Sequence, residues 1–122
     1  MTGSRDLALT AARAASAKKG QDIVVMDVRD LIGITDFFVL ASGSSDRQVR
    51  TIAEEVERSV REDGGVKPVR REGQRDGRWV LLDFVDFVVH VFHDEAREYY
   101  GLERLWADAA VVPWEDRAAS SG

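Results

Sequence analysis

The stretch RWVLLDFVDFVVHVFHD, residues 78–94, constrains the fold more than any other part of the chain. It is almost entirely apolar, rich in β-branched and aromatic residues, and interrupted by two aspartates, which is typical of two strands joined by a turn. A tight turn at Phe84 and Val85 would place Trp79 opposite His90. Such a turn favours positive φ, which β-branched residues resist, so a longer or bulged turn with a different register is the alternative.

Alternation with a period of two sorts these side chains onto two faces of the strand pair. One face is wholly apolar and must lie under helices; it carries Val80, Leu82, Phe87, Val89 and Val91. The other face is mixed; it carries Trp79, Leu81, Asp83, Asp86, Val88, His90 and Phe92. A mixed face of this kind is either half-solvated or a binding surface.

The rest of the chain predicts an α/β domain with the order αββαβββα and a five-stranded mixed sheet. Helices are expected over residues 4–19, 45–64 and 93–109, and strands over 22–28, 36–42, 66–72, 78–83 and 86–92. The second helix is the clearest, because Ser45 and Gln48 form a capping box and Gly64 and Gly65 follow its apolar stripe. Gly101 weakens the third helix. Residues 1–108 are expected to form a single domain, and 109–122 a flexible C-terminal tail.

Composition excludes several classes of function. The chain has no cysteine, which rules out thiol catalysis, Cys-ligated zinc and disulfides. The net charge of −5 argues against direct DNA binding, which rests on a basic patch, and fits a basic protein partner or simply solubility. No apolar run is long enough to cross a bilayer, and the first 20 residues do not resemble a secretory signal, so we expect a cytoplasmic protein without membrane contact.

The carboxylates and histidines of the strand pair do not form a convincing catalytic or metal site. A nucleotidyltransferase holds magnesium with two acids spaced two apart, whereas Asp83 and Asp86 are three apart. His90 and His93 lie on opposite faces of a continuing strand, and His90 is expected to pack against Trp79. We therefore expect no enzyme, metal or cofactor. The alternative is a small nucleotide-binding protein or nucleotidyltransferase that uses the turn at residues 42–45, where backbone amides precede a helix.

Three segments in this order resemble the ribosomal silencing factor family, also called the Iojap family. They are ITDFFVLASGSSDRQVRTIAEEV, WVLLDFVDFVVHVF and AREYYGLERLW, and the resemblance spans roughly residues 5–107. It implies a nucleotidyltransferase-like fold without the catalytic acids. It also implies a translational repressor that binds ribosomal protein L fourteen on the large ribosomal subunit and sterically blocks joining of the small subunit when nutrients are short. Several family members are homodimers, so a homodimer is expected for the free protein.

The resemblance and the mixed face together predict a partner-binding set. Its members are Trp79, Leu81, Asp83, Asp86, His90, Tyr99, Tyr100, Leu105 and Trp106. Large aromatic side chains anchor interfaces, and carboxylates accept hydrogen bonds from basic partners. Each position also has a structural interpretation: Trp79 could cover the sheet, the two aspartates could cap the turn, and Leu105 and Trp106 could belong to the core. Thr35 is expected to organise the start of the strand at residue 36.

Overall fold

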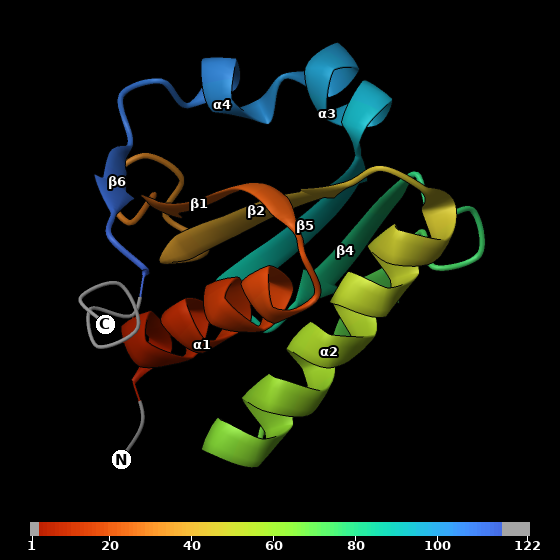
Figure 1. The fold of residues 1–122 in the computed structure, drawn as a ribbon. Coiled ribbons are helices and arrows are strands. Elements are labelled where there is room, and N and C mark those ends of the chain that lie inside the picture. The colour runs from red at the N-terminus through yellow and green to blue at the C-terminus, as the bar shows by residue number, and fades with distance from the viewer. Residues whose placement is uncertain (1–2, 116–122) are drawn as a thin grey trace.

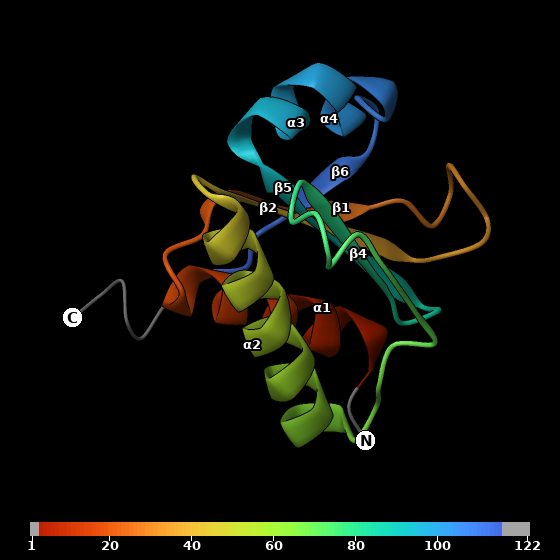
Figure 2. The same cartoon turned by 90° about the vertical axis from the view of Figure 1, so that its right-hand side faces the viewer.

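The computed structural model describes residues 3–115 and has a six-stranded sheet with helices on both faces (Figures 1 and 2). The elements are α1 (Ser4–Ala17), β1 (Gln21–Asp27), β2 (Phe37–Gly43), α2 (Asp46–Gly64), β3 (Arg70–Glu72), β4 (Trp79–Asp83), β5 (Phe87–His93), α3 (Asp94–Tyr100), α4 (Leu102–Leu105) and β6 (Ala110–Val112). The strand order is β3-β4-β5-β2-β1-β6. Strands β2 and β5 run parallel and the other neighbours antiparallel, which confirms a mixed α/β fold.

The two faces of the sheet are covered differently. Helices α1 and α2 pack on one face, and α3 and α4 lie over part of the other (Figures 1 and 2). The face under α1 and α2 is the wholly apolar one: Val80, Val89 and Val91 are fully buried against the apolar stripe of α2. Since burial of each such side chain contributes about 1.5–3 kcal/mol, this layer is the main core of the domain.

Helix α2 begins at the predicted cap. Ser45 Oγ accepts a hydrogen bond from the backbone N–H of Gln48 at 3.0 Å, and Gln48 Oε1 accepts one from the backbone N–H of Ser44 at 2.7 Å. The helix ends at Gly65, which adopts a left-handed conformation and donates its N–H to the carbonyl of Arg61. Both ends of α2 are therefore satisfied by local sequence, as the capping signals predict.

Removing the cap gives a first prediction. The Ser45→Ala variant is expected to lose about 1 kcal/mol of unfolding free energy, because the backbone N–H of Gln48 loses its acceptor. Urea unfolding followed by circular dichroism measures the change. Ser45→Thr is the matched control, since it keeps a hydroxyl at the cap, and it should unfold near the native midpoint. Equal losses in the two variants would mean that the hydroxyl does not stabilise the helix.

The prediction of five strands and a flexible tail from residue 109 is wrong for residues 110–112. These residues form β6, which pairs antiparallel with β1 at the edge of the sheet. Trp114 Nε1 then donates to the backbone carbonyl of Ile23 at 3.0 Å, and Arg13 Nε donates to the carbonyl of Trp114. A three-residue strand has too few positions to show alternation, so its partner β1 determines it. Residues 116–122 of the expected tail lie outside the described residues.

The last predicted helix is interrupted at Gly101. This residue has φ 57° and ends α3, and α4 starts directly after it. Glycine adopts this conformation without the steric penalty of a side chain. The helix therefore ends at Gly101, where the sequence predicts only a weaker helix. The N-cap of α3 is His93, whose Nδ1 accepts from the backbone N–H of Glu95 at 3.3 Å.

The turn between β4 and β5 lies one residue later than the predicted tight turn: the N–H of Phe84 donates to the carbonyl of Phe87 at 3.0 Å, which leaves Val85 and Asp86 between them. Asp83 pairs with Val88, and Trp79 pairs with Phe92 rather than His90. Val85 lies within the turn and has φ 74°, an unusual conformation for a β-branched residue. The register is two residues away from that of the tight turn. A shift of two preserves the alternation, so both predicted faces survive and only Asp86 leaves the strand pair.

Candidate partner-binding surface

A chain of aromatic rings lies on the face of the sheet that α3 and α4 cover. We call it the aromatic cluster; it comprises Phe38, Trp79, His90, Phe92, Tyr99, Tyr100 and Trp106. Trp79 is central, with ring centroids 4.7 Å from Tyr100 and 4.9 Å from Phe92. Phe38 meets the ring of Trp106 at 5.0 Å. The structure thus brings together five of the nine predicted site residues, from β4, β5, α3 and the segment after α4.

His90 and Trp79 form the polar centre of the aromatic cluster. Trp79 Nε1 donates a hydrogen bond to His90 Nδ1 at 3.1 Å, as expected for a strand histidine packed against Trp79. His90 is only 5% exposed, and burial lowers the pKa of its imidazole from 6.5 to about 4. The ring is therefore neutral near pH 7. Because the indole nitrogen can only donate, His90 Nδ1 is the acceptor and the ring proton is on Nε2.

Helices α3 and α4 present the most exposed part of this surface. Tyr99 is 79% exposed and Leu105 is 70% exposed, and Tyr100 stands between Tyr99 and Trp79. Leu105 is therefore not a core residue. Trp106 is half-buried and packs against Phe38, beside an apolar cluster that includes Met26, Leu40 and Phe92, which agrees with its structural interpretation. Exposed aromatic and aliphatic side chains grouped on one face are typical of a protein-binding surface.

Leu81, Asp83 and Asp86 lie toward the other end of the strand pair. Leu81 pairs with His90 in the sheet and is half-buried. Asp83 Oδ1 accepts from the backbone N–H of Val85 at 2.8 Å, so Asp83 caps the turn, as one of the two interpretations predicts. Asp86 lies in the turn, exposed, and its backbone carbonyl accepts from the N–H of Asp36. The structure thus separates Asp86 from the aromatic cluster and leaves its carboxylate accessible.

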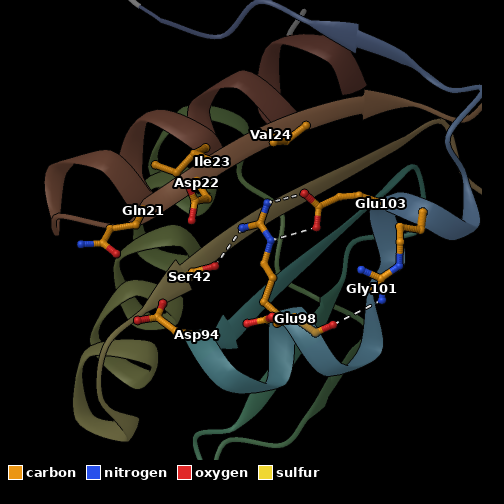
Figure 3. A pocket seen from close by; sticks show the side chains of 11 residues that line it. Gln21, Asp22, Ile23, Val24, Ser42, Asp94, Glu98, Gly101 and Glu103 are labelled. Atoms are coloured by element: carbon orange, nitrogen blue, oxygen red, sulfur yellow. Dashed lines mark hydrogen bonds and ion pairs between the residues drawn. The ribbon is translucent and has the colours of Figure 1, made fainter.

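Sequence reasoning missed a buried arginine beside this surface. Arg97 of α3 is 8% exposed and lines a pocket of about 640 Å³ between β1, β2, α3 and α4 (Figure 3). Its Nη1 donates to Ser42 Oγ at 2.9 Å, and its Nε and Nη2 donate to the carboxylate of Glu103 at 3.0 Å each. These hydrogen bonds hold the pKa of Glu103 below its ordinary value, although burial acts in the opposite direction.

The spacing of this pair explains why it was missed. Arg97 and Glu103 are six residues apart, and in one continuous helix they would not share a face, because neighbours there are three or four apart. The break at Gly101 turns α4 back so that the two side chains meet (Figure 3). Arg97 joins α3, α4 and β2, and it thereby fixes the helices that carry Tyr99 and Leu105.

The turn at residues 42–45 is occupied by contacts within the fold. Ser42 is buried and its hydroxyl accepts from Arg97. Ser44 donates both its N–H and its hydroxyl to Gln48 Oε1, and Ser45 caps α2. Within residues 3–115, no three histidine or acidic side chains gather where they could hold a metal ion. The side chains of this turn therefore support the helix and the sheet, and no contact of theirs favours the nucleotide alternative.

The fold and the surface together define a small α/β domain with an exposed aromatic face. No helix in the described part of the chain is long and apolar enough to span a bilayer. A family model described as "Ribosomal silencing factor during starvation" matches residues 2–121. The chain belongs to this ribosomal silencing factor family, which confirms the resemblance found in the sequence and extends it to residues 2–121.

Individual relatives support the assignment. The ribosomal silencing factor of Halalkalibacterium halodurans is 40% identical over 112 residues, which is 92% of this chain and 95% of the relative. That of Bacillus subtilis is 42% identical over 102 residues, covering 84% and 86% of the two chains. A crystal structure of a protein from Chromobacterium violaceum superposes with a TM-score of 0.81 at 37% identity, covering 84% of this chain and 85% of that chain.

Proposed function

We propose that this protein is a cytoplasmic translational repressor that binds the large ribosomal subunit and acts without catalysis. It docks on ribosomal protein L fourteen and sterically prevents the small subunit from joining, which damps translation when nutrients are limiting. When free of the ribosome, the protein is a homodimer. Membership of the ribosomal silencing factor family is the observation that carries this proposal.

The exposed aromatic face is the proposed docking surface. Tyr99, Tyr100 and Leu105 project from α3 and α4, and Trp79 supports them from the sheet. Side chains of this type account for most of the binding free energy in interfaces, particularly where a rigid scaffold holds them. Leu81, His90 and Trp106 belong to the same face of the sheet. Asp86 is available to accept hydrogen bonds from lysine or arginine, and Asp83 acts mainly by shaping its turn.

Co-sedimentation with purified large subunits, followed by addition of small subunits, tests the proposal. The native protein is expected to pellet with large subunits and to lower the amount of joined ribosome. The double variant Tyr99→Ala with Leu105→Ala is expected to bind at least about 30-fold more weakly, the loss typical of an interface hot spot. Because both side chains are mostly exposed, its melting temperature should stay close to that of the native protein.

The matched control is Val66→Ala, another partly exposed aliphatic residue. Val66 follows α2, whose C-terminal end points away from α3 and α4 (Figure 1). This variant should bind and inhibit subunit joining like the native protein. A native protein that stays in the supernatant would refute the proposal, and equal binding by the double variant and the control would place the docking surface elsewhere.

A further inference from the structure

A second, smaller pocket opens beside Leu81 on the same face of the sheet. It has a volume of about 200 Å³ and lies between β4, β5, the turn after β4 and the segment that precedes β2. Phe38, Leu81 and Val88 form apolar walls. Ile34, 82% exposed, and Val85, 54% exposed, form an apolar rim. Small-molecule sites usually have volumes of about 300–1,000 Å³, so this pocket suits a single side chain better than a nucleotide.

Two buried polar atoms on residues that line this pocket have no hydrogen-bond partner among the described residues. They are Oγ1 of Thr35 and Nε2 of His90, and both residues line the pocket. Thr35 is 7% exposed and His90 is 5% exposed. More than nine-tenths of buried polar groups in proteins are paired, so two unpaired atoms on residues that line one pocket need an explanation. A group that enters the pocket on binding would supply one.

The chemistry of these atoms specifies that group. Trp79 donates to Nδ1 of His90, so Nε2 carries the ring proton and can only donate. The hydroxyl of Thr35 can donate or accept. The group that enters the pocket must therefore supply a hydrogen-bond acceptor. A lysine or arginine would bring only further donors toward Nε2. Arg70 and Asp83 both line the pocket, lie 3.7 Å apart and offset each other's charge, so the pocket has no net charge that would favour a charged occupant.

We propose that this pocket receives one neutral side chain of the ribosomal partner, whose hydroxyl or amide oxygen accepts hydrogen bonds from His90 and Thr35. The inference rests on the proposed function and adds a recognition element to it. Trp79 links the pocket to the docking surface, because its side chain contacts Tyr100 and donates a hydrogen bond to His90. The exposed carboxylate of Asp86 binds basic groups of the partner. The surface therefore binds a cation and a neutral hydrogen-bond acceptor at separate places.

Thr35→Val in the full chain tests this inference. Valine has nearly the same shape as threonine and lacks the hydroxyl. Because the hydroxyl has no partner in the free protein, the variant should melt at the native temperature or above it. In the complex the same change removes a hydrogen bond, so binding to purified large subunits should weaken about 5- to 10-fold. Thr35→Ser restores the hydroxyl and is expected to recover most of the affinity.

Thr51→Val is the matched control, since Thr51 belongs to α2 on the opposite face of the sheet. It should bind large subunits like the native protein. Native-like binding by Thr35→Val would overturn the inference while leaving the proposed function intact. Weaker self-association of Thr35→Val with unchanged subunit binding would also overturn it, because the occupant would then be a second copy of this chain. Failure of the native protein to bind large subunits would remove the proposed function and this inference together.

Discussion

Replacing Gly73 with alanine is expected to lower the free energy of unfolding by at least about 3 kcal/mol. Gly73 lies between β3 and β4 with φ 84°, where L-residues other than glycine are strained. A Cβ atom at this position would lie 1.9 Å from the carbonyl oxygen of Trp79 and 2.9 Å from its carbonyl carbon. Both atoms belong to the main chain of β4, so no side-chain rotation relieves the contact and the start of the strand must move.

Gly65→Ala separates the clash from the backbone strain. Gly65 has φ 67°, but a Cβ there would meet no atom within 4 Å. This control should lose only about 1 kcal/mol, the cost of a left-handed alanine. Urea unfolding of both variants measures the difference. Equal losses would mean that the turn before Trp79 adapts easily. Since β4 carries Trp79, Gly73→Ala is also expected to weaken binding to large subunits more than Gly65→Ala does.

The sequence was sufficient to predict the two faces of the strand pair, even though it did not predict the register. Alternation alone assigns Val80 and Val89 to the buried face and Leu81 and His90 to the other. A turn placed one residue later changes the pairing by two residues and leaves this assignment unchanged, because side chains repeat every two residues. The unusual conformation of Val85 could not be predicted, since local sterics disfavour it and the hydrogen bond from its N–H to Asp83 stabilises it.

Features that depend on distant partners were not predictable in the same way. Strand β6 forms because β1 has an unpaired edge with which it can form hydrogen bonds. Trp114 packs there because the carbonyl of Ile23, 91 residues earlier, accepts a hydrogen bond from its indole N–H. The Arg97–Glu103 pair needs the break at Gly101, a position that propensity marks only as weak. Local patterns carry no information on such contacts until the chain has been placed in space.

The candidate site also contains some features that the sequence predicts and others that only the fold reveals. Residue types predicted the aromatic side chains at Trp79, Tyr99 and Tyr100, and the structure groups them on one face. Thr35 was expected only to organise the start of a strand. Its role in the pocket proposed above depends on the unpaired hydroxyl and on the neighbouring His90, which lies 55 residues later in the chain. Only the fold brings those two residues into the lining of one pocket.

Acidification is expected to destabilise the protein by about 3 kcal/mol through His90 alone. Burial lowers the pKa of His90 to about 4, whereas in the unfolded chain it is 6.5. Above pH 6.5 both states are neutral and His90 has no effect. Between pH 6.5 and pH 4 the unfolded state binds a proton that the folded state does not, so stability falls over this range. Below pH 4 the loss attributable to His90 is complete.

His90→Gln isolates this contribution, because glutamine does not titrate and keeps an oxygen that can accept from Trp79. Asp27, Glu55 and Glu103 have lowered pKa values, and each loses stabilising contacts as it is protonated in acid. They affect the native protein and the variant alike. The control is His93→Gln, which leaves the Trp79–His90 contact in place. Urea unfolding at pH 7 and pH 4.5 measures the loss of stability on acidification. This loss should be smaller in His90→Gln than in the native protein and in the control. Identical losses in all three would mean that His90 is protonated within the fold, and that its Nδ1 is not reserved for Trp79.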